Sequence, residues 1–203
     1  MDLFMQQINR IQDVYRPVEE RVKDNKEVER KLTSVEIVGQ AGRCHTCGIP
    51  FCHGAGCPLG NLIPEFNAAV ALGNAERAYD IISKTAFFPE FTGRVCPALC
   101  ESACTGNVHN DPVMVRQIEK FIIETAYEEG WVKLPAAEPN GKSAAVIGSG
   151  PAGLFAAEAL RRKGFAVTVY EKREKAGGLL RYGKINVRIN IQLLVQKIIV
   201  HLK

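Results

Sequence analysis

The sequence has no long apolar segment. No stretch approaches the ~18 apolar residues that a membrane-spanning helix needs. Residues 1–17 mix apolar, polar and charged side chains, whereas a secretory signal peptide requires a continuous apolar region. We therefore expect a cytoplasmic protein with no membrane partner.

The sequence also has no concentrated block of charge. The formal net charge is +4 over 203 residues, and the Lys and Arg side chains are spread along the chain. Nucleic-acid-binding proteins usually gather basic side chains in one tract or on one face, so we expect no nucleic-acid partner. Hydrophobic residues make up 46% of the chain, which is enough for one large or two small globular domains.

Cysteine is absent after Cys104, and all seven cysteines lie between Cys44 and that residue. In a reducing compartment such a concentration indicates metal ligands, and an odd number argues against a closed disulfide framework. Thiolates prefer soft metal centres, and short spacings let one loop supply several ligands. The cysteines form two runs: Cys44, Cys47, Cys52 and Cys57, then Cys96, Cys100 and Cys104.

Iron–sulfur clusters and zinc are the two metal centres to weigh. Proline follows Cys57 and Cys96, as it follows cluster-binding cysteines in bacterial ferredoxins. Two 4Fe–4S clusters need eight ligands, so seven cysteines leave one to find. Structural zinc remains an alternative because His45, His53 and His109 could complete two sites. The spacing lacks two C-x2-C pairs, which favours iron–sulfur clusters.

Composition divides the chain into four predicted segments. Residues 1–40 form a helical or irregular arm, 41–134 a helical cluster domain, 135–142 a linker, and 143–203 the start of an α/β domain. Within the cluster domain, periodicity predicts two short helices in 67–86 that meet at Gly73-Asn74, and another helix over 113–128. Asp111-Pro112 is expected to cap that last helix. Pro89 and Gly93 predict that 87–94 is a loop packed on the core.

A glycine-rich turn follows the linker. Residues 143–147 are expected to form a buried strand, 152–163 a helix and 166–170 a second strand, which is the opening of a parallel α/β sheet. The turn between the first strand and the helix reads G-x-G-x-x-G, with Gly148, Gly150 and Gly153. These glycines allow a tight turn, approach of a pyrophosphate and close helix packing.

Glu171 ends the second predicted strand, where an acidic side chain can bind a ribose hydroxyl. An acidic residue there disfavours a 2′-phosphate, so the site is expected to prefer FAD or NAD. Residues 171–183 resemble the E-x5-GG-x4-G continuation of flavoproteins that have two dinucleotide domains, which favours FAD. The candidate FAD-binding residues are Gly148, Gly150, Pro151, Ala152, Gly153, Glu171, Gly178, Leu179 and Arg181.

Three segments resemble the N-terminal domain of glutamate synthase small subunits, a family with NADPH-dependent members. They are RCHTCGIPFC at 43–52, CPLGNLIP at 57–64 and FPEFTGRVCPALCESAC at 88–104. The resemblance implies a small all-helical domain with two 4Fe–4S clusters, followed by the beginning of a Rossmann-type FAD-binding parallel sheet (class α + α/β).

The resemblance also implies crossed ligation between the two cysteine runs. One cluster would take Cys44, Cys47, Cys52 and Cys104. The other would take Cys57, Cys96, Cys100 and a non-cysteine ligand, for which the matching position is Glu119. From the residues alone, Glu119 is an ordinary helix carboxylate.

In that family NADPH reduces FAD, and the electrons pass through the clusters to a large subunit in a hetero-oligomer. Family members continue through the rest of the FAD domain and an NADPH domain, so we expect this chain to be truncated, with no catalytic residues of its own. After Gly183 the sequence also departs from the family pattern. Two alternatives remain: a non-catalytic cluster-carrying subunit of a bifurcating hydrogenase, formate dehydrogenase or similar complex, and a zinc-stabilised interaction module.

Overall fold

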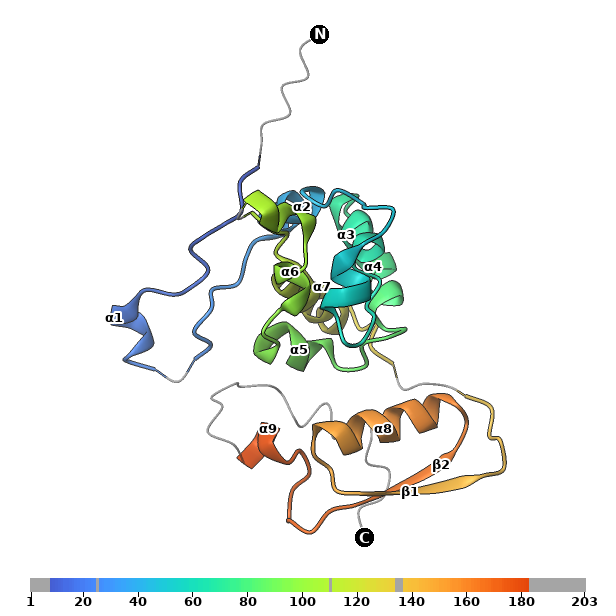
Figure 1. Cartoon of the computed structure of the whole chain (residues 1–203). Helices are drawn as coiled ribbons and strands as arrows, with labels where there is room; N and C mark the ends of the chain where they lie inside the picture. Colours follow the sequence, from blue (N-terminus) through green and yellow to red (C-terminus); the bar gives the residue numbers. More distant parts are fainter. Residues whose placement is uncertain (1–7, 25, 110, 134–136, 183–203) are drawn as a thin grey trace. The chain divides into compact units, whose positions relative to one another are not determined.

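A computed structural model describes residues 8–24, 26–109, 111–133 and 137–182 (Figure 1). The chain divides into two compact units, one formed mainly by Val28–Trp131 and the other mainly by the residues from Val132 on. The sequence after Gly183, where the family pattern is lost, lies outside the described residues. The predicted segment boundaries at 40, 134 and 142 stay predictions.

The arm at the start of the first unit is mostly irregular. It contains α1 (Val18–Arg21) and one antiparallel bridge, between Tyr15 and Glu29. Helix α2 (Ser34–Gly42) follows, and it begins with a capping box in which Thr33 Oγ1 accepts from the Glu36 backbone N–H and the Glu36 carboxylate accepts from the Thr33 N–H. This reciprocal pairing satisfies two backbone donors at the start of the helix. It fixes where α2 begins; the helix ends at Gly42, two residues before Cys44.

Short helices form the remainder of the first unit. They are the π-helix η1 (Cys52–Gly56), α3 (Ile63–Ala71), α4 (Ala75–Ile82), α5 (Pro89–Val95), α6 (Leu99–Ser102), the 3-10 helix η2 (Thr105–His109) and α7 (Val115–Glu128). Their apolar faces meet in one core, in which Phe66, Ile82, Ile118 and Ile122 are fully buried. Figure 1 shows α7 running behind the cysteine-bearing segments.

The pair of helices expected within 67–86 is confirmed as α3 and α4, although α3 begins earlier, at Ile63. Gly73 has a positive φ of 74° between them, and Asn74 caps α4 by accepting from the Arg77 N–H at 2.9 Å. The helix expected over 113–128 is confirmed as α7. The cap expected at Asp111-Pro112 is wrong, since the residue before α7 is Met114.

The loop expected over 87–94 is also wrong, because Pro89–Val95 forms helix α5. Pro89 occupies the first turn, where a missing N–H costs no helical hydrogen bond. Gly93 lies where α5 crosses α7, and a Cβ there would be 3.0 Å from the Cα of Lys120. Pro89 therefore lies at the start of α5, Gly93 allows α5 to pack closely on α7, and neither residue interrupts the helix.

The second unit contains β1 (Ser143–Ile147), α8 (Pro151–Arg162), β2 (Ala166–Tyr170) and α9 (Leu179–Tyr182). The two strands pair in parallel with Ser143 opposite Ala166, which confirms the predicted strand–helix–strand opening. The first strand was expected to be buried, but its burial alternates and Ser143, Ala145 and Ile147 are exposed. Helix α8 packs on both strands.

None of the helices within the described residues is long and apolar enough to cross a lipid bilayer.

Candidate functional site

Four of the seven cysteines line one cavity of about 750 Å³ in the first unit. We call these residues the cavity group: Cys44, Cys47, Cys52 and Cys104. Cys44 follows the C-cap of α2, Cys47 lies in the loop before η1, Cys52 begins η1, and Cys104 lies between α6 and η2. This is the set that the resemblance assigns to one cluster, although Cys104 is distant in sequence from the other three.

The thiols of the cavity group lie close enough to repel one another as thiolates. The pKa of Cys52 is raised to about 11, mainly by burial and also by Cys104, Cys44 and Cys47, while the backbone N–H of His53 acts in the opposite direction. A buried thiol with other thiols around it stays protonated unless a cation compensates the charge of its thiolate form. Binding of a cationic metal centre would therefore release protons from this group.

The other ligand candidates surround Cys100 at the start of α6. We call them the helix group: Cys57, Cys96, Cys100 and Glu119. Burial raises the pKa of Cys100, and Glu119, Glu101, Cys57 and Cys96 raise it further, in that order. The charges of Cys57, Cys96 and Glu119 thus act on the Cys100 thiol.

Gly56 lets the two cysteine runs meet. A Cβ at Gly56 would lie 2.7 Å from the Cα of Cys100 and 2.9 Å from the Cβ of Ala103. Atoms at those distances overlap, so only glycine allows η1 to rest against α6. This contact places Cys57, the residue after η1, beside the second run.

Both cysteine loops hold a strained backbone. Thr46, two residues after Cys44, has a φ of 46°, and Ala98, two residues after Cys96, has a φ of 56°. A left-handed conformation costs a non-glycine residue roughly 1–2 kcal/mol, and such strain is concentrated at functional sites. In the second loop the turn aims the Ala98 N–H at the Cys96 sulfur, at 3.4 Å.

Glu119 is buried in α7 and has one hydrogen-bonding side chain beside it. Asn61 Nδ2 donates to Glu119 Oε1 at 2.9 Å, and Thr85 Oγ1 donates to Asn61 Oδ1 at 2.8 Å. The pKa of Glu119 is raised to about 7: burial is the largest cause, the Asn61 hydrogen bond lowers the pKa, and the Glu101 charge raises it. Sequence analysis missed Asn61, whose partners are far away along the chain.

The chemistry of the donor sets fits iron–sulfur clusters. Seven thiols and one carboxylate supply the eight positions that two clusters need, and soft thiolates are the usual cluster ligands. The cavity is also far larger than a single ion requires. Within the described ranges, no three His, Cys, Asp or Glu side chains converge as ligands of one metal ion.

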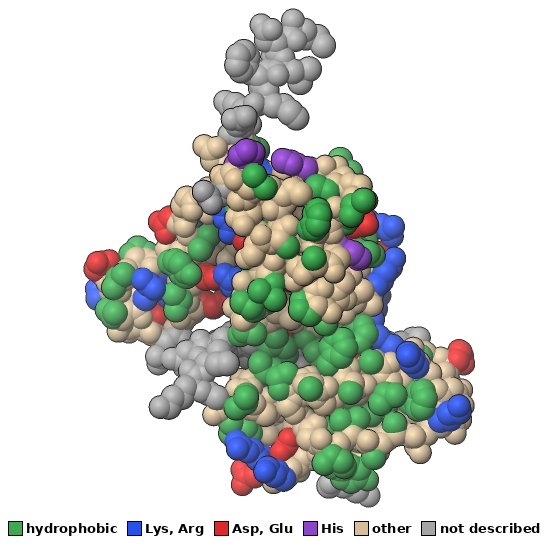
Figure 2. Space-filling view, in the orientation of Figure 1, with side chains coloured by type: hydrophobic (Ala, Val, Ile, Leu, Met, Phe, Trp, Pro, Cys, Tyr) green, Lys and Arg blue, Asp and Glu red, His purple; other side chains and the backbone are tan. Residues whose placement is uncertain are grey.

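The surface near the cysteines carries apolar side chains. Ile49 and Phe51 lie between Cys47 and Cys52, and Leu99 precedes Cys100; each is more than half exposed. Figure 2 shows hydrophobic side chains at the surface of the first unit.

The second unit builds the predicted glycine turn. Gly148 has a φ of 94°, and a Cβ at Gly153 would lie 2.0 Å from the Gly148 carbonyl oxygen. Pro151 and Ala152 are exposed at the start of α8, where free backbone N–H groups attract phosphate. Gly178 rests against Gly150, since a Cβ there would be 2.7 Å from the Gly150 Cα.

Glu171 is held against the glycine turn by Ser149. The Ser149 N–H donates to Glu171 Oε2 at 2.9 Å, and the Ser149 hydroxyl donates to the same oxygen. The Arg173 N–H donates to the other oxygen at 3.0 Å. These hydrogen bonds, led by the Ser149 hydroxyl, lower the pKa of Glu171 to about 2, so the residue is a carboxylate at neutral pH.

Ser149 also accepts from the Gly177 N–H at 3.1 Å, so one buried hydroxyl joins the glycine turn, the acidic residue and the second glycine pair. Sequence analysis missed it because serine at the variable position of the motif carries no signal. The remaining predicted residues, Leu179 and Arg181, lie in α9; Leu179 is exposed, and Arg181 Nε donates to the Ala176 carbonyl at 2.8 Å.

Comparison with known proteins gives two family matches. The profile of dihydropyrimidine dehydrogenase domain II, 4Fe-4S cluster, matches residues 21–131, and that of the NAD(P)-binding Rossmann-like domain matches residues 146–193. The first match includes both the cavity group and the helix group. The second includes the glycine turn and Glu171.

Curated relatives include several glutamate synthases. The chain is 51% identical over 169 residues to the NADPH-dependent glutamate synthase small chain of Mycobacterium tuberculosis, covering 83% of this chain and 34% of that protein. It is 34% identical to the Escherichia coli small chain, covering 87% and 38%. Against the NADH-dependent glutamate synthase of Saccharomyces cerevisiae it is 44% identical, covering 92% and 9%. The chain thus spans about a third of the length of the small-chain relatives.

Proposed function

Because this chain belongs to the 4Fe–4S family of dihydropyrimidine dehydrogenase domain II, we propose that it is an electron-transfer iron–sulfur flavoprotein module. The observation that carries the proposal is that Cys44, Cys47, Cys52 and Cys104 line one cavity. Iron–sulfur clusters exchange single electrons, and a flavin exchanges electron pairs or single electrons. The chain would hold these groups in place and tune them.

The cavity group would hold one 4Fe–4S cluster and the helix group the other. Gly56 and the turns at Thr46 and Ala98 orient the thiols. Asn61 would hold the Glu119 carboxylate toward its cluster by donating to one oxygen, which leaves the second oxygen for iron. The donated hydrogen bond also favours the ionised form that a ligand requires.

The dinucleotide site would take the adenosine and pyrophosphate part of FAD. The exposed start of α8 suits the pyrophosphate, and the Glu171 carboxylate keeps lone pairs for the ribose hydroxyls. A negative charge there disfavours a 2′-phosphate, which argues against NADP at this position. The contact of Gly178 with Gly150 places the flavoprotein-type second glycine pair on the same turn, which supports FAD over NAD.

Electrons would pass from NADPH through FAD and the clusters to a partner. By likeness to the small-chain relatives, the partner would be a glutamate synthase large subunit in a hetero-oligomer, and NADPH would bind residues beyond those described. The exposed apolar side chains around the cysteine loops would suit contact with that partner. Seven cysteines with a metal-binding role suit the reducing cytoplasm.

Replacing Glu119 by alanine tests the cluster half of the proposal. We expect the purified protein to lose roughly half of its iron and one of two EPR signals, because the helix group would keep only three ligands. E128A is the matched control, since Glu128 lies on the same helix and is exposed, paired with Lys31. Unchanged iron and EPR in E119A, with helicity intact by circular dichroism, would remove Glu119 from the ligand set.

Replacing Gly153 by alanine tests the dinucleotide half. The added Cβ would collide with the Gly148 carbonyl oxygen, so the turn that faces the pyrophosphate has to open. We expect the FAD affinity, measured by fluorescence titration, to fall by more than about tenfold. A156S, an exposed change on the same helix, is expected to bind FAD normally. Equal FAD affinity in G153A and A156S would contradict the assignment.

A further inference from the structure

Glu101 lies between the two ligand groups. It directly follows Cys100 of the helix group and precedes Cys104 of the cavity group by three residues. Its side chain is 13% exposed. One carboxylate oxygen accepts from the Arg116 backbone N–H at 3.0 Å, and the other accepts from Arg10 Nη2 at 2.6 Å. A largely buried carboxylate thus directly follows a residue of the helix group and is paired with one arginine side chain.

Arg10 comes from the arm and is fixed by several contacts. Its Nη1 donates to the Pro112 carbonyl at 2.8 Å, and its backbone N–H donates to Asp111 Oδ1 at 3.3 Å. The preceding residue, Asn9, lines the cavity and accepts from Gln40 Nε2 at 2.9 Å through its carbonyl. These contacts therefore hold the Arg10 guanidinium in one position beside the segments that carry the candidate ligands.

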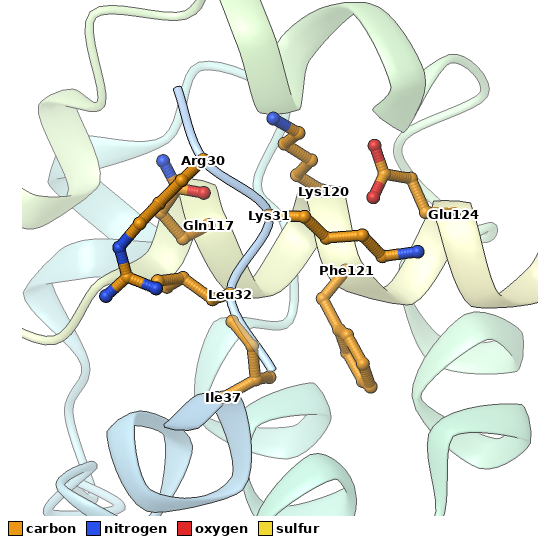
Figure 3. Close-up of a pocket in the computed structure, with 8 residues that line it drawn as sticks. All are labelled: Arg30, Lys31, Leu32, Ile37, Gln117, Lys120, Phe121 and Glu124. Carbon is orange, nitrogen blue, oxygen red and sulfur yellow. The ribbon is translucent and has the colours of Figure 1, made fainter. Parts of the chain in front are cut away.

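Two neighbouring arginines pair with other carboxylates, Arg43 with Asp111 and Arg116 with Glu29. The Arg116 guanidinium does not donate to Glu101. It donates instead to Glu29 and to the Arg94 carbonyl oxygen. Gln117 Nε2 also donates to Glu29, at 2.8 Å. Figure 3 shows the segment after Glu29, from Arg30 to Leu32, crossing α7 beside Gln117 and Lys120. Among the described residues, Arg10 is the cation that forms an ion pair with Glu101.

The charge of Glu101 reaches the helix group. It raises the pKa of both Cys100 and Glu119, so its field is felt at two candidate ligands. Charges that are shielded from water are screened weakly. A negative charge near a cluster opposes the arrival of an electron, and a positive charge that compensates it has the reverse effect, so both shift the reduction potential.

Resting on the proposed function, we propose that the Arg10–Glu101 ion pair sets the reduction potential of the cluster held by the helix group. Glu101 lowers that potential, and Arg10 raises it by compensating the carboxylate. The arm then contributes to the reduction potential of this cluster, because Arg10 supplies the compensating charge. Arg10 and Glu101 act through the field at the cluster and are not ligands.

Redox titration of the full chain, purified anaerobically and followed by EPR, tests the proposal. Dithionite serves as the reductant. We expect R10Q to lower the midpoint potential of one cluster signal, E101Q to raise it, and the double variant to return it close to the original value. The E101Q amide oxygen can still accept from the Arg116 N–H, so the start of α7 keeps its partner. R10K keeps the charge and is expected to keep the potential.

Unmoved potentials in both R10Q and E101Q, at unchanged iron content, would overturn the inference. Shifts in the same direction in both variants would also overturn it, because they would indicate a structural change. Should R10Q lose iron, E101Q decides: a raised potential supports the ion pair's role and an unmoved one refutes it. A chain that binds no cluster before any substitution would instead refute the proposed function.

Discussion

C52A is expected to remove the cluster of the cavity group and to leave that of the helix group, and C100A is expected to do the reverse. Each thiol is the one that its three companions surround, so each loss leaves a three-ligand site. We expect roughly half of the iron and sulfide to remain in each variant, with a different EPR signal surviving. S102A, between Cys100 and Cys104 on the second run, is the control and is expected to keep both signals.

The same measurement separates crossed from sequential ligation. If Cys57 completes the helix group, C57A loses the same EPR signal as C100A, although Cys57 is much nearer to Cys52 in sequence. If Cys104 completes the cavity group, C104A loses the same signal as C52A. A result in which C57A and C52A lose one common signal would contradict the two groups that the fold brings together.

G56A is expected to lose the cluster of the helix group and to destabilise the first unit. The new methyl group would overlap the Cα of Cys100 and the Cβ of Ala103, so η1 and α6 have to separate and carry Cys57 away from Cys100. Overpacking of this kind costs about 1–3 kcal/mol, and we expect a lower thermal unfolding midpoint together with lost iron.

G54A is the matched control for that experiment. Gly54 lies in the same π-helix, and nothing lies within 4 Å of the position of its added Cβ. We expect G54A to keep its iron and its unfolding midpoint within a degree or so of the original. Equal behaviour of G56A and G54A would show that the close approach of η1 and α6 is not needed for cluster binding.

Local signals predicted the second unit well. The strands at 143–147 and 166–170 and the helix between them follow from short apolar runs on either side of the glycine turn, which are local properties of the chain. The α5 helix was missed because Pro89 and Gly93 usually interrupt helices. Here their roles depend on α7, which is distant in sequence, so no local pattern could show them.

The spacing of the cysteines alone could not predict which residues belong to each ligand set. The two cysteine runs indicate metal binding, but their crossed grouping depends on the contact between η1 and α6, and a family resemblance was required to anticipate it. Asn61 and Arg10 were missed entirely. Asn61 meets Glu119 across 58 positions, and Arg10 meets Glu101 across 91. Ordinary polar residues with remote partners leave no periodic signal.

Metal and sulfide analysis of the anaerobically purified chain, together with its visible spectrum, tests the central claim most directly. The two groups of four ligands predict about eight iron and about eight sulfide per chain, and a brown protein that absorbs broadly near ~400 nm. A colourless protein that carries stoichiometric zinc and no sulfide would contradict the account.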